Sequence, residues 1–66
     1  MQKKEIRLLN DGKAADVLDT QIQTLRNWRC QLKGPPYIKI GRNVRYRLED
    51  LIKFMEDNRI DPNDLK

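Results

Sequence analysis

Residues 14–28 read AADVLDTQIQTLRNW, and two sets of apolar residues with helical spacing are separated there by a polar interruption. The first set predicts a short helix over residues 11–18, and the second predicts another helix that begins near residue 22. Asp19 is one of the few residue types that tolerate a left-handed backbone, so we expect a turn over residues 19–21. The apolar positions are Ala14, Ala15 and Leu18 in the first helix and Ile22, Leu25, Trp28 and Leu32 in the second. Two helices joined by such a turn form a helix-turn-helix.

Residues on either side of these helices indicate where each begins and ends. Asn10 can cap the first helix, because its side-chain oxygen accepts from backbone amides that are free in the first turn. Asp11 adds favourable negative charge at the same end. Gly34, Pro35 and Pro36 end the second helix, since a proline cannot donate to the helical hydrogen-bond ladder.

After the prolines, the apolar spacing changes from helical to alternating. Residues 37–40 and 44–47 alternate apolar and basic side chains around residues 41–43, which predicts a β-hairpin with a basic tip and a basic outer face. Glu49 and Asp50 then open a third helix. Its apolar positions are Leu48, Leu51, Ile52, Phe54 and Met55.

These elements fit one small domain, because a chain of 66 residues holds a single modest core. The sequence therefore predicts a small α+β fold, a winged helix-turn-helix that consists of two helices, a two-stranded wing hairpin and a third helix. We expect this single domain to span residues 1–66. Its last part, residues 58–66, is expected to be a flexible tail, since Pro62 stops the third helix from extending.

Charge is distributed unevenly along the chain. The net charge is +4, but residues 20–48 contain no Asp or Glu. The basic side chains in this block are Arg26, Arg29, Lys33, Lys39, Arg42, Arg45 and Arg47. Such a block is typical of a protein that binds a polyanion, and a merely solvated basic face is the alternative. A membrane surface is disfavoured, because the block contains turn and strand signals rather than one long amphipathic helix.

The composition argues against several other classes of protein. The chain has no histidine and no serine, so the usual nucleophile–base pairs cannot be built, and Cys30 alone can form neither an internal disulfide nor a zinc site. We expect no enzymatic activity, no cofactor and no small-molecule ligand, because so short a chain offers no concave site. There is no apolar run long enough for a transmembrane helix or a signal peptide, so the expected location is the cytoplasm.

Five segments in this order resemble the excisionase/MerR-like helix-turn-helix family. They are residues 14–18, 24–28, 34–42, 44–47 and 49–51, and the resemblance extends from about Leu8 to Met55. It implies a phage or mobile-element excisionase, or a small AlpA-like regulator, acting in a bacterial host cell. It also implies that the second helix enters a DNA major groove while the wing touches the flanking backbone or minor groove.

The sequence departs from this family in the turn, at the start of the second helix and on the face of that helix. Asp19 stands in place of the usual turn glycine and Gln21 in place of the usual capping serine. Gln23 and Asn27 occupy positions where Arg and an aromatic residue are common. The preferred DNA sequence of the family therefore cannot be transferred to this chain.

The candidate DNA contacts on the second helix lie on its polar side. Gln23 and Asn27 are one turn apart and can make bidentate contacts with adenine, although ordinary solvated helix surface is the alternative. Thr24 suits a phosphate or a thymine methyl, and Arg26 suits a guanine or a phosphate. Arg29 lies beside the apolar side and is expected to clamp a phosphate. Gln21 completes this set at the start of the helix.

The remaining contacts are expected from the wing. Arg42, Asn43 and Arg45 are its main candidates, because arginine is favoured in a narrow minor groove, and protection of an edge strand by charge is a compatible role. Lys39 and Lys33 are expected to contact phosphates without regard to sequence.

Two aromatic residues raise a different possibility. Trp28 and Tyr46 could stack on the bases of a single strand. Trp28, however, is in register with Leu25 and Leu32, which favours a place in the core.

The expected partners are double-stranded DNA, further copies of the chain assembled on it, and a cognate integrase. An excisionase is the preferred interpretation. A transcriptional regulator needs the same groove-reading module and stays open as the alternative, and a protein-interaction module is the competing class.

Overall fold

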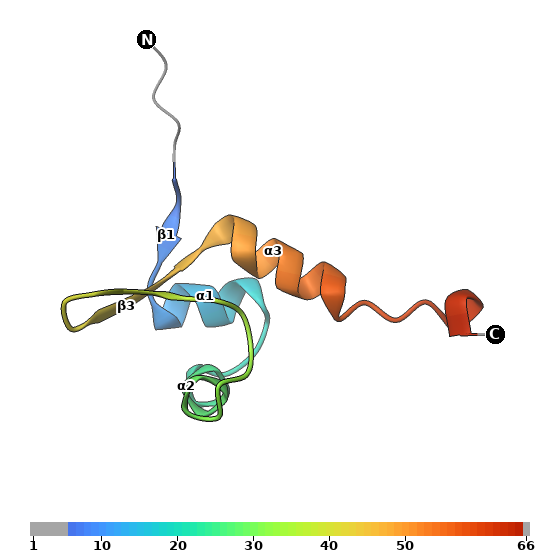
Figure 1. The fold of residues 1–66 in the computed structure, drawn as a ribbon, viewed down its shortest axis with the longest axis horizontal. Helices are drawn as coiled ribbons and strands as arrows, with labels where there is room; N and C mark the ends of the chain where they lie inside the picture. Colours follow the sequence, from blue (N-terminus) through green and yellow to red (C-terminus); the bar gives the residue numbers. More distant parts are fainter. Residues whose placement is uncertain (1–5, 66) are drawn as a thin grey trace, which may run out of the picture.

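The structure, a computed structural model, describes residues 6–65; the ends of the predicted domain, residues 1–5 and Lys66, lie outside the described residues. The elements follow one another as β1 (Leu8–Leu9), α1 (Asp11–Val17), α2 (Ile22–Cys30), β2 (Ile38–Ile40), β3 (Asn43–Arg47), α3 (Leu48–Asp57) and a 3-10 helix η1 (Pro62–Leu65) (Figure 1). This order confirms the predicted winged helix-turn-helix. The region predicted to be a flexible tail contains η1, and its flexibility stays a prediction.

The sheet is antiparallel, with β3 between β1 and β2. β2 and β3 form the predicted hairpin, with Ile38 opposite Arg45 and Ile40 opposite Asn43. Gly41 has a φ of 62° in the two-residue turn, which favours glycine because the backbone there is left-handed. β1 was not predicted, since a strand of two residues is too short to show an alternating pattern.

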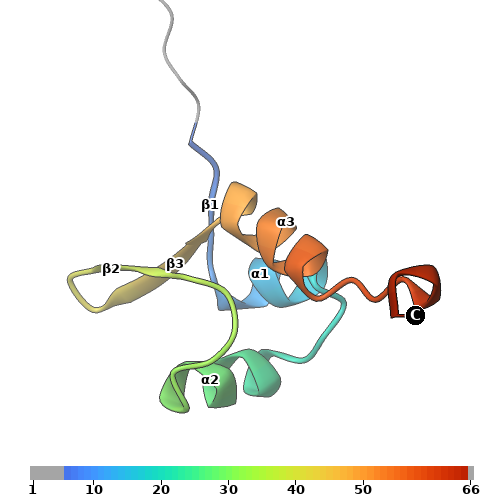
Figure 2. The same cartoon turned by 45° about the vertical axis from the view of Figure 1, so that its right-hand side comes forward.

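The helices pack on one another and leave the wing to project to one side. In Figures 1 and 2, α1 lies between α2 and α3, while β2 and β3 extend beyond all three helices. The buried core consists of Leu9, Ala14, Ala15, Leu25, Tyr46 and Leu51. Leu18, Trp28, Val44 and Leu48 pack against it. The fold thus holds α2 and the wing in fixed positions around a small core.

Both ends of α1 are closed by the residues that the sequence indicated. The Oδ1 atom of Asn10 accepts from the backbone N–H of Lys13 at 2.9 Å, as expected of a cap. The helix ends at Val17, one residue earlier than predicted. Asp19 has a φ of 52°, and the next residue, Thr20, donates its N–H to the carbonyl of Ala15 at 2.9 Å. This Schellman closure produces the predicted turn.

The same closure ends α2, and it overturns one prediction. Lys33 donates its N–H to the carbonyl of Trp28 at 2.7 Å, and Leu32 has a φ of 56°. The left-handed backbone takes Leu32 out of the helical register, so its side chain is 90% exposed and the prediction that it extends the apolar face of α2 is wrong. Gly34 follows with a φ of 84°, and a Cβ there would lie 3.0 Å from the Cβ of Trp28.

The aromatic residues take part in the core. The ring of Trp28 packs against that of Phe54 with centroids 5.7 Å apart, and Tyr46 is fully buried. These positions favour the core over stacking on bases. On α3, Leu51 is buried, whereas Ile52 and Met55 are exposed although the sequence placed them among its apolar positions. Nothing in the described residues covers them.

The strained backbone at Leu32 leads to a stability prediction. Leu32→Gly should raise the free energy of unfolding by about 0.5–1 kcal/mol, because a left-handed residue with a Cβ costs roughly 1–2 kcal/mol and glycine offsets part of the gain through its entropy. Thermal unfolding followed by circular dichroism measures the change. Leu32→Ala is the matched control, since it removes the exposed side chain but keeps the strain. Equal stability of the two variants would contradict the account.

Candidate nucleic-acid interface

An open hollow of about 450 Å³ lies where α2, the wing and the start of α1 meet. The expectation that so short a chain forms no concave site is therefore wrong, because α2, the wing and the start of α1 enclose this space between them. Its lining residues are Asn10, Asp11, Gly12, Arg26, Arg29, Arg42, Asn43, Val44 and Arg45. Four arginines and a single carboxylate make this surface strongly positive. The fold therefore brings predicted contacts from α2 and predicted contacts from the wing to one place.

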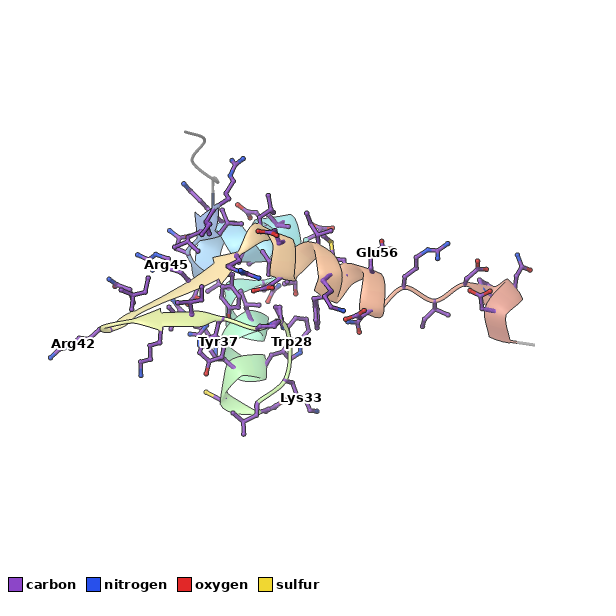
Figure 3. The ribbon with its side chains drawn as sticks, turned by 45° about the horizontal axis from the view of Figure 1, so that its top comes forward. Trp28, Lys33, Tyr37, Arg42, Arg45 and Glu56 are labelled. Atoms are coloured by element: carbon purple, nitrogen blue, oxygen red, sulfur yellow. The ribbon has the colours of Figure 1, made fainter. Side chains whose placement is uncertain are left out.

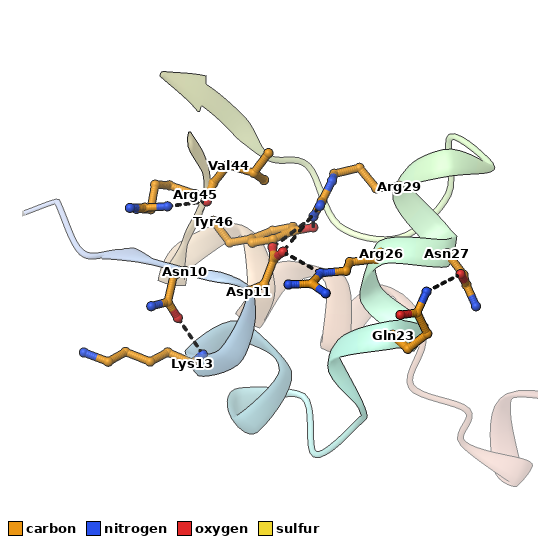
Figure 4. A network of polar contacts seen from close by, with 10 residues as sticks. All are labelled: Asn10, Asp11, Lys13, Gln23, Arg26, Asn27, Arg29, Val44, Arg45 and Tyr46. Carbon is orange, nitrogen blue, oxygen red and sulfur yellow. Dashed lines mark hydrogen bonds and ion pairs between the residues drawn. The ribbon is translucent and has the colours of Figure 1, made fainter. Parts of the chain in front are cut away.

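The two amide side chains of α2 are hydrogen-bonded to each other. The Nε2 atom of Gln23 donates to the Oδ1 atom of Asn27 at 3.0 Å, and both side chains are exposed (Figure 4). This bond leaves the Oε1 atom of Gln23 as an acceptor and the Nδ2 atom of Asn27 as a donor, with no other partner in the described residues. The pair presents an acceptor and a donor one helical turn apart.

An ion-pair network connects the two helices of the helix-turn-helix with the sheet (Figure 4). The Nη1 atom of Arg29 donates to the Oδ1 atom of Asp11 at 2.9 Å and to the hydroxyl of Tyr46 at 2.8 Å. The Nε atom of Arg26 donates to the Oδ2 atom of the same carboxylate at 3.2 Å. The guanidinium of Arg29 also lies over the ring of Tyr37, 5.6 Å from its centroid.

These contacts shift the pKa values of Asp11, Arg29 and Tyr46. Burial raises the pKa of Asp11, but the hydrogen bonds and charges of Arg29 and Arg26 outweigh burial and lower it overall. The hydrogen bond to Asp11 raises the pKa of Arg29. Burial raises the pKa of the Tyr46 hydroxyl. At neutral pH the Asp11 carboxylate is therefore ionised, Arg29 is a cation and the Tyr46 phenol is neutral.

Arg29 is the predicted contact whose surroundings differ most from expectation. Its side chain is only 19% exposed, and its guanidinium is occupied by Asp11, Tyr46 and Tyr37. Arg26, by contrast, is 54% exposed, and only its Nε atom is bonded. Of the two arginines of α2, Arg26 is the one available to a ligand.

The wing residues are exposed to different degrees. Arg42 stands at the tip of the wing, away from the helices (Figure 3), and Asn43 beside it is also exposed. Arg45 is half-buried, and its Nη1 atom donates to the carbonyl of Val44 at 2.8 Å. Lys39 is exposed on β2 and lies outside the hollow.

Other predicted contacts lie away from the hollow. Lys33 borders a separate shallow groove beyond the end of α2, well apart from Arg42 in Figure 3. Gln21 is exposed at the N-cap position of α2, and its side chain makes no capping hydrogen bond. Thr24 is half-buried within the helix. Arg47, the last basic residue of the acid-free block, pairs with Asp50 at 3.0 Å.

Sequence reasoning missed the part of the hollow that comes from the start of α1. Asp11 was interpreted only as a favourable charge for that helix, and Gly12 was not singled out. No local pattern connects Asp11 with Arg26 and Arg29, which lie 15 and 18 residues further along the chain. Proximity to the basic block does not single out Asp11 either, because Asp16 and Asp19 both lie nearer to it.

Two further features are absent from the described residues. None of their helices is long and apolar enough to cross a membrane. They also contain no group of three or more acidic, cysteine or histidine side chains that could hold a metal ion.

Comparison with known proteins places the chain in a family. No curated protein and no solved structure matches it. A family model described as a helix-turn-helix domain matches residues 8–59, which include every helix and strand from β1 to α3. The chain therefore belongs to this helix-turn-helix family, which includes excisionase-like and AlpA-like small DNA-binding proteins.

Proposed function

We propose that this chain recognises a specific sequence in double-stranded DNA, with α2 in the major groove and the wing on the flanking backbone or minor groove. The observation that carries the proposal is the hollow, which has α2 on one side and the wing on the other and is lined by four arginines. The sugar-phosphate backbone of one DNA strand separates a major groove from the adjacent minor groove. A protein whose helix enters the major groove and whose wing enters the minor groove must leave room for that backbone between the helix and the wing.

The residues take different roles in this arrangement. Gln23 and Asn27 would read a base, since adenine presents an N6 donor and an N7 acceptor that match their free acceptor and donor. The phosphates of the backbone in the hollow would be bound by Arg26, Arg42 and Arg45.

The other predicted contacts are proposed to add to this interface. Asn43 accompanies Arg42 in the wing, and Thr24 and Gln21 lie near the start of α2. Lys39 and Lys33 are proposed as phosphate contacts outside the hollow. The helix-turn-helix family is typically non-enzymatic, in keeping with a role in binding.

We further propose that the chain is an excisionase, which binds several adjacent sites, bends the DNA and assists an integrase. Membership of a family that includes excisionase-like proteins supports this. A single recognition helix of nine residues and one wing contact too little DNA for high specificity, so several adjacent copies would be needed. Bending a short site costs roughly 1–6 kcal/mol, which added phosphate contacts can offset.

The bend distinguishes an excisionase from a transcriptional regulator. Mobility shifts of circularly permuted fragments should show a bend that increases as successive copies bind, and excision by the cognate integrase should require the protein. A regulator needs only to occupy a promoter. Straight DNA with one bound copy, and excision that proceeds without the protein, would favour a regulator instead.

A further inference from the structure

Asp11 places a carboxylate in a hollow whose other charged side chains are all arginines. Its side chain is 18% exposed and lines the hollow together with Arg26, Arg29, Arg42 and Arg45. A negative charge at this position repels DNA phosphates and reduces the local positive potential. A neutral residue at this position would give stronger binding to DNA of any sequence. The presence of a carboxylate therefore needs an explanation other than affinity for phosphates.

The contacts of Asp11 restrain the two arginines of α2. Arg29 is held by both carboxylate oxygens, at 2.9 Å and 3.4 Å, and by Tyr46, so its guanidinium cannot turn toward a phosphate without breaking these bonds. Arg26 is held only at its Nε atom, at 3.2 Å, and its two Nη atoms remain free of bonds to the described residues. The carboxylate thus withdraws one arginine from the surface and fixes the direction of the other.

We infer that Asp11 determines specificity: it limits how far Arg26 and Arg29 can adapt to phosphates, and it thereby keeps binding to arbitrary DNA weak. The inference rests on the proposed function. On the preferred site, the base contacts of α2 fix the register, so Arg26 meets its phosphate in the held orientation and gains little from release. On arbitrary DNA no register is fixed, and freed arginines would find phosphates that the restrained ones cannot reach.

The test compares Asp11→Asn with the unaltered chain on two short fluorescent duplexes. One duplex has a random sequence, and the other is selected by the unaltered chain from a randomised library. Fluorescence anisotropy gives the affinity between about 50 and 200 mM salt. On the random duplex, the variant should bind about five- to tenfold more tightly at 0.1 M salt, with a log–log salt slope steeper by about 0.9, because one additional phosphate is neutralised. On the selected duplex the affinity should rise by less than about twofold, so discrimination falls by about 2.5- to 10-fold.

Asp16→Asn is the matched control. Asp16 is an exposed residue of α1 that does not line the hollow and makes no ion pair with another described residue. Its substitution changes the net charge by the same amount and should leave the salt slope nearly unchanged. An identical slope for the two variants, or a discrimination ratio that Asp11→Asn leaves unchanged, would overturn the inference.

A purely structural role of Asp11 gives a different result. The variant would then be less stable and would bind both duplexes more weakly, with no increase in slope. Should Asp11→Asn fail to fold, the comparison is made between Arg29→Gln and Arg29→Gln with Asp11→Asn, in which no half-buried cation lacks a partner. Release of Arg26 should again steepen the slope, and an unchanged slope overturns the inference. If the unaltered chain binds neither duplex, the proposed function itself fails.

Discussion

Arg42→Ala combined with Arg45→Ala should weaken binding to every duplex by about 60-fold at 0.1 M salt and reduce the salt slope by about 1.8. Both arginines line the wing side of the hollow, where they would neutralise one phosphate each. Each lost contact contributes about 0.9 to the slope, which corresponds to about eightfold in affinity at this salt concentration. Anisotropy titrations on a selected and on a random duplex measure both quantities.

Lys53→Ala with Arg59→Ala provides the control for this loss of charge. Both residues pair with acidic neighbours, Asp57 at 3.2 Å and Asp61 at 3.6 Å, and neither lines the hollow. The double substitution lowers the net charge by the same amount and should change affinity only slightly. A similar loss in the two double variants would mean that overall charge, and not the wing, determines binding.

Gln23→Ala with Asn27→Ala should reduce discrimination between the selected duplex and one with the recognised base changed by about 10- to 100-fold. One good bidentate contact contributes about 1–3 kcal/mol of discrimination, and the hydrogen bond between the two side chains makes them a single reading unit. Binding to random DNA should be nearly unaffected, since neither residue carries a charge. Alanine preserves the helix, so stability should change little.

Competition binding with single-base variants of the selected duplex measures this effect. Gln31→Ala is the matched control, because it removes an exposed amide at the end of the same helix. Loss of sequence preference in the wing variants, together with full preference in the Gln23 and Asn27 variant, would place the reading element in the wing.

Much of the fold could be predicted because its signals are local. Three such signals are the cap at Asn10, the left-handed residue Asp19 and the glycine in the hairpin turn. Each affects the backbone only within a few residues of its own position. Leu32 was placed wrongly because its type fits the helical pattern, whereas its backbone is determined by the closure of the helix end. β1 forms only because β3 offers a partner about 38 residues further along the chain, which no short pattern encodes.

The candidate site was predictable in its charges and less so in its geometry. The acid-free block identified Arg26, Arg42 and Arg45, which the fold gathers around one hollow. That Arg29 faces Asp11 and Tyr46 depends on how α1, α2 and β3 pack, and periodicity within one helix does not contain this information. Likewise, Lys33 lies beyond the end of α2 and borders a separate groove, which its membership of the basic block does not indicate.

The most direct test of the central claim is a titration of the ¹⁵N-labelled chain with its selected duplex, followed by amide chemical shifts. Simultaneous contact by α2 and the wing predicts the largest changes over residues 21–29 and 39–45, together with Asn10 and Asp11 in the hollow between them. Amides of α3 and η1 should shift little, since neither element contributes to the hollow. Large changes confined to α3, or changes on α2 without any on the wing, would contradict the account.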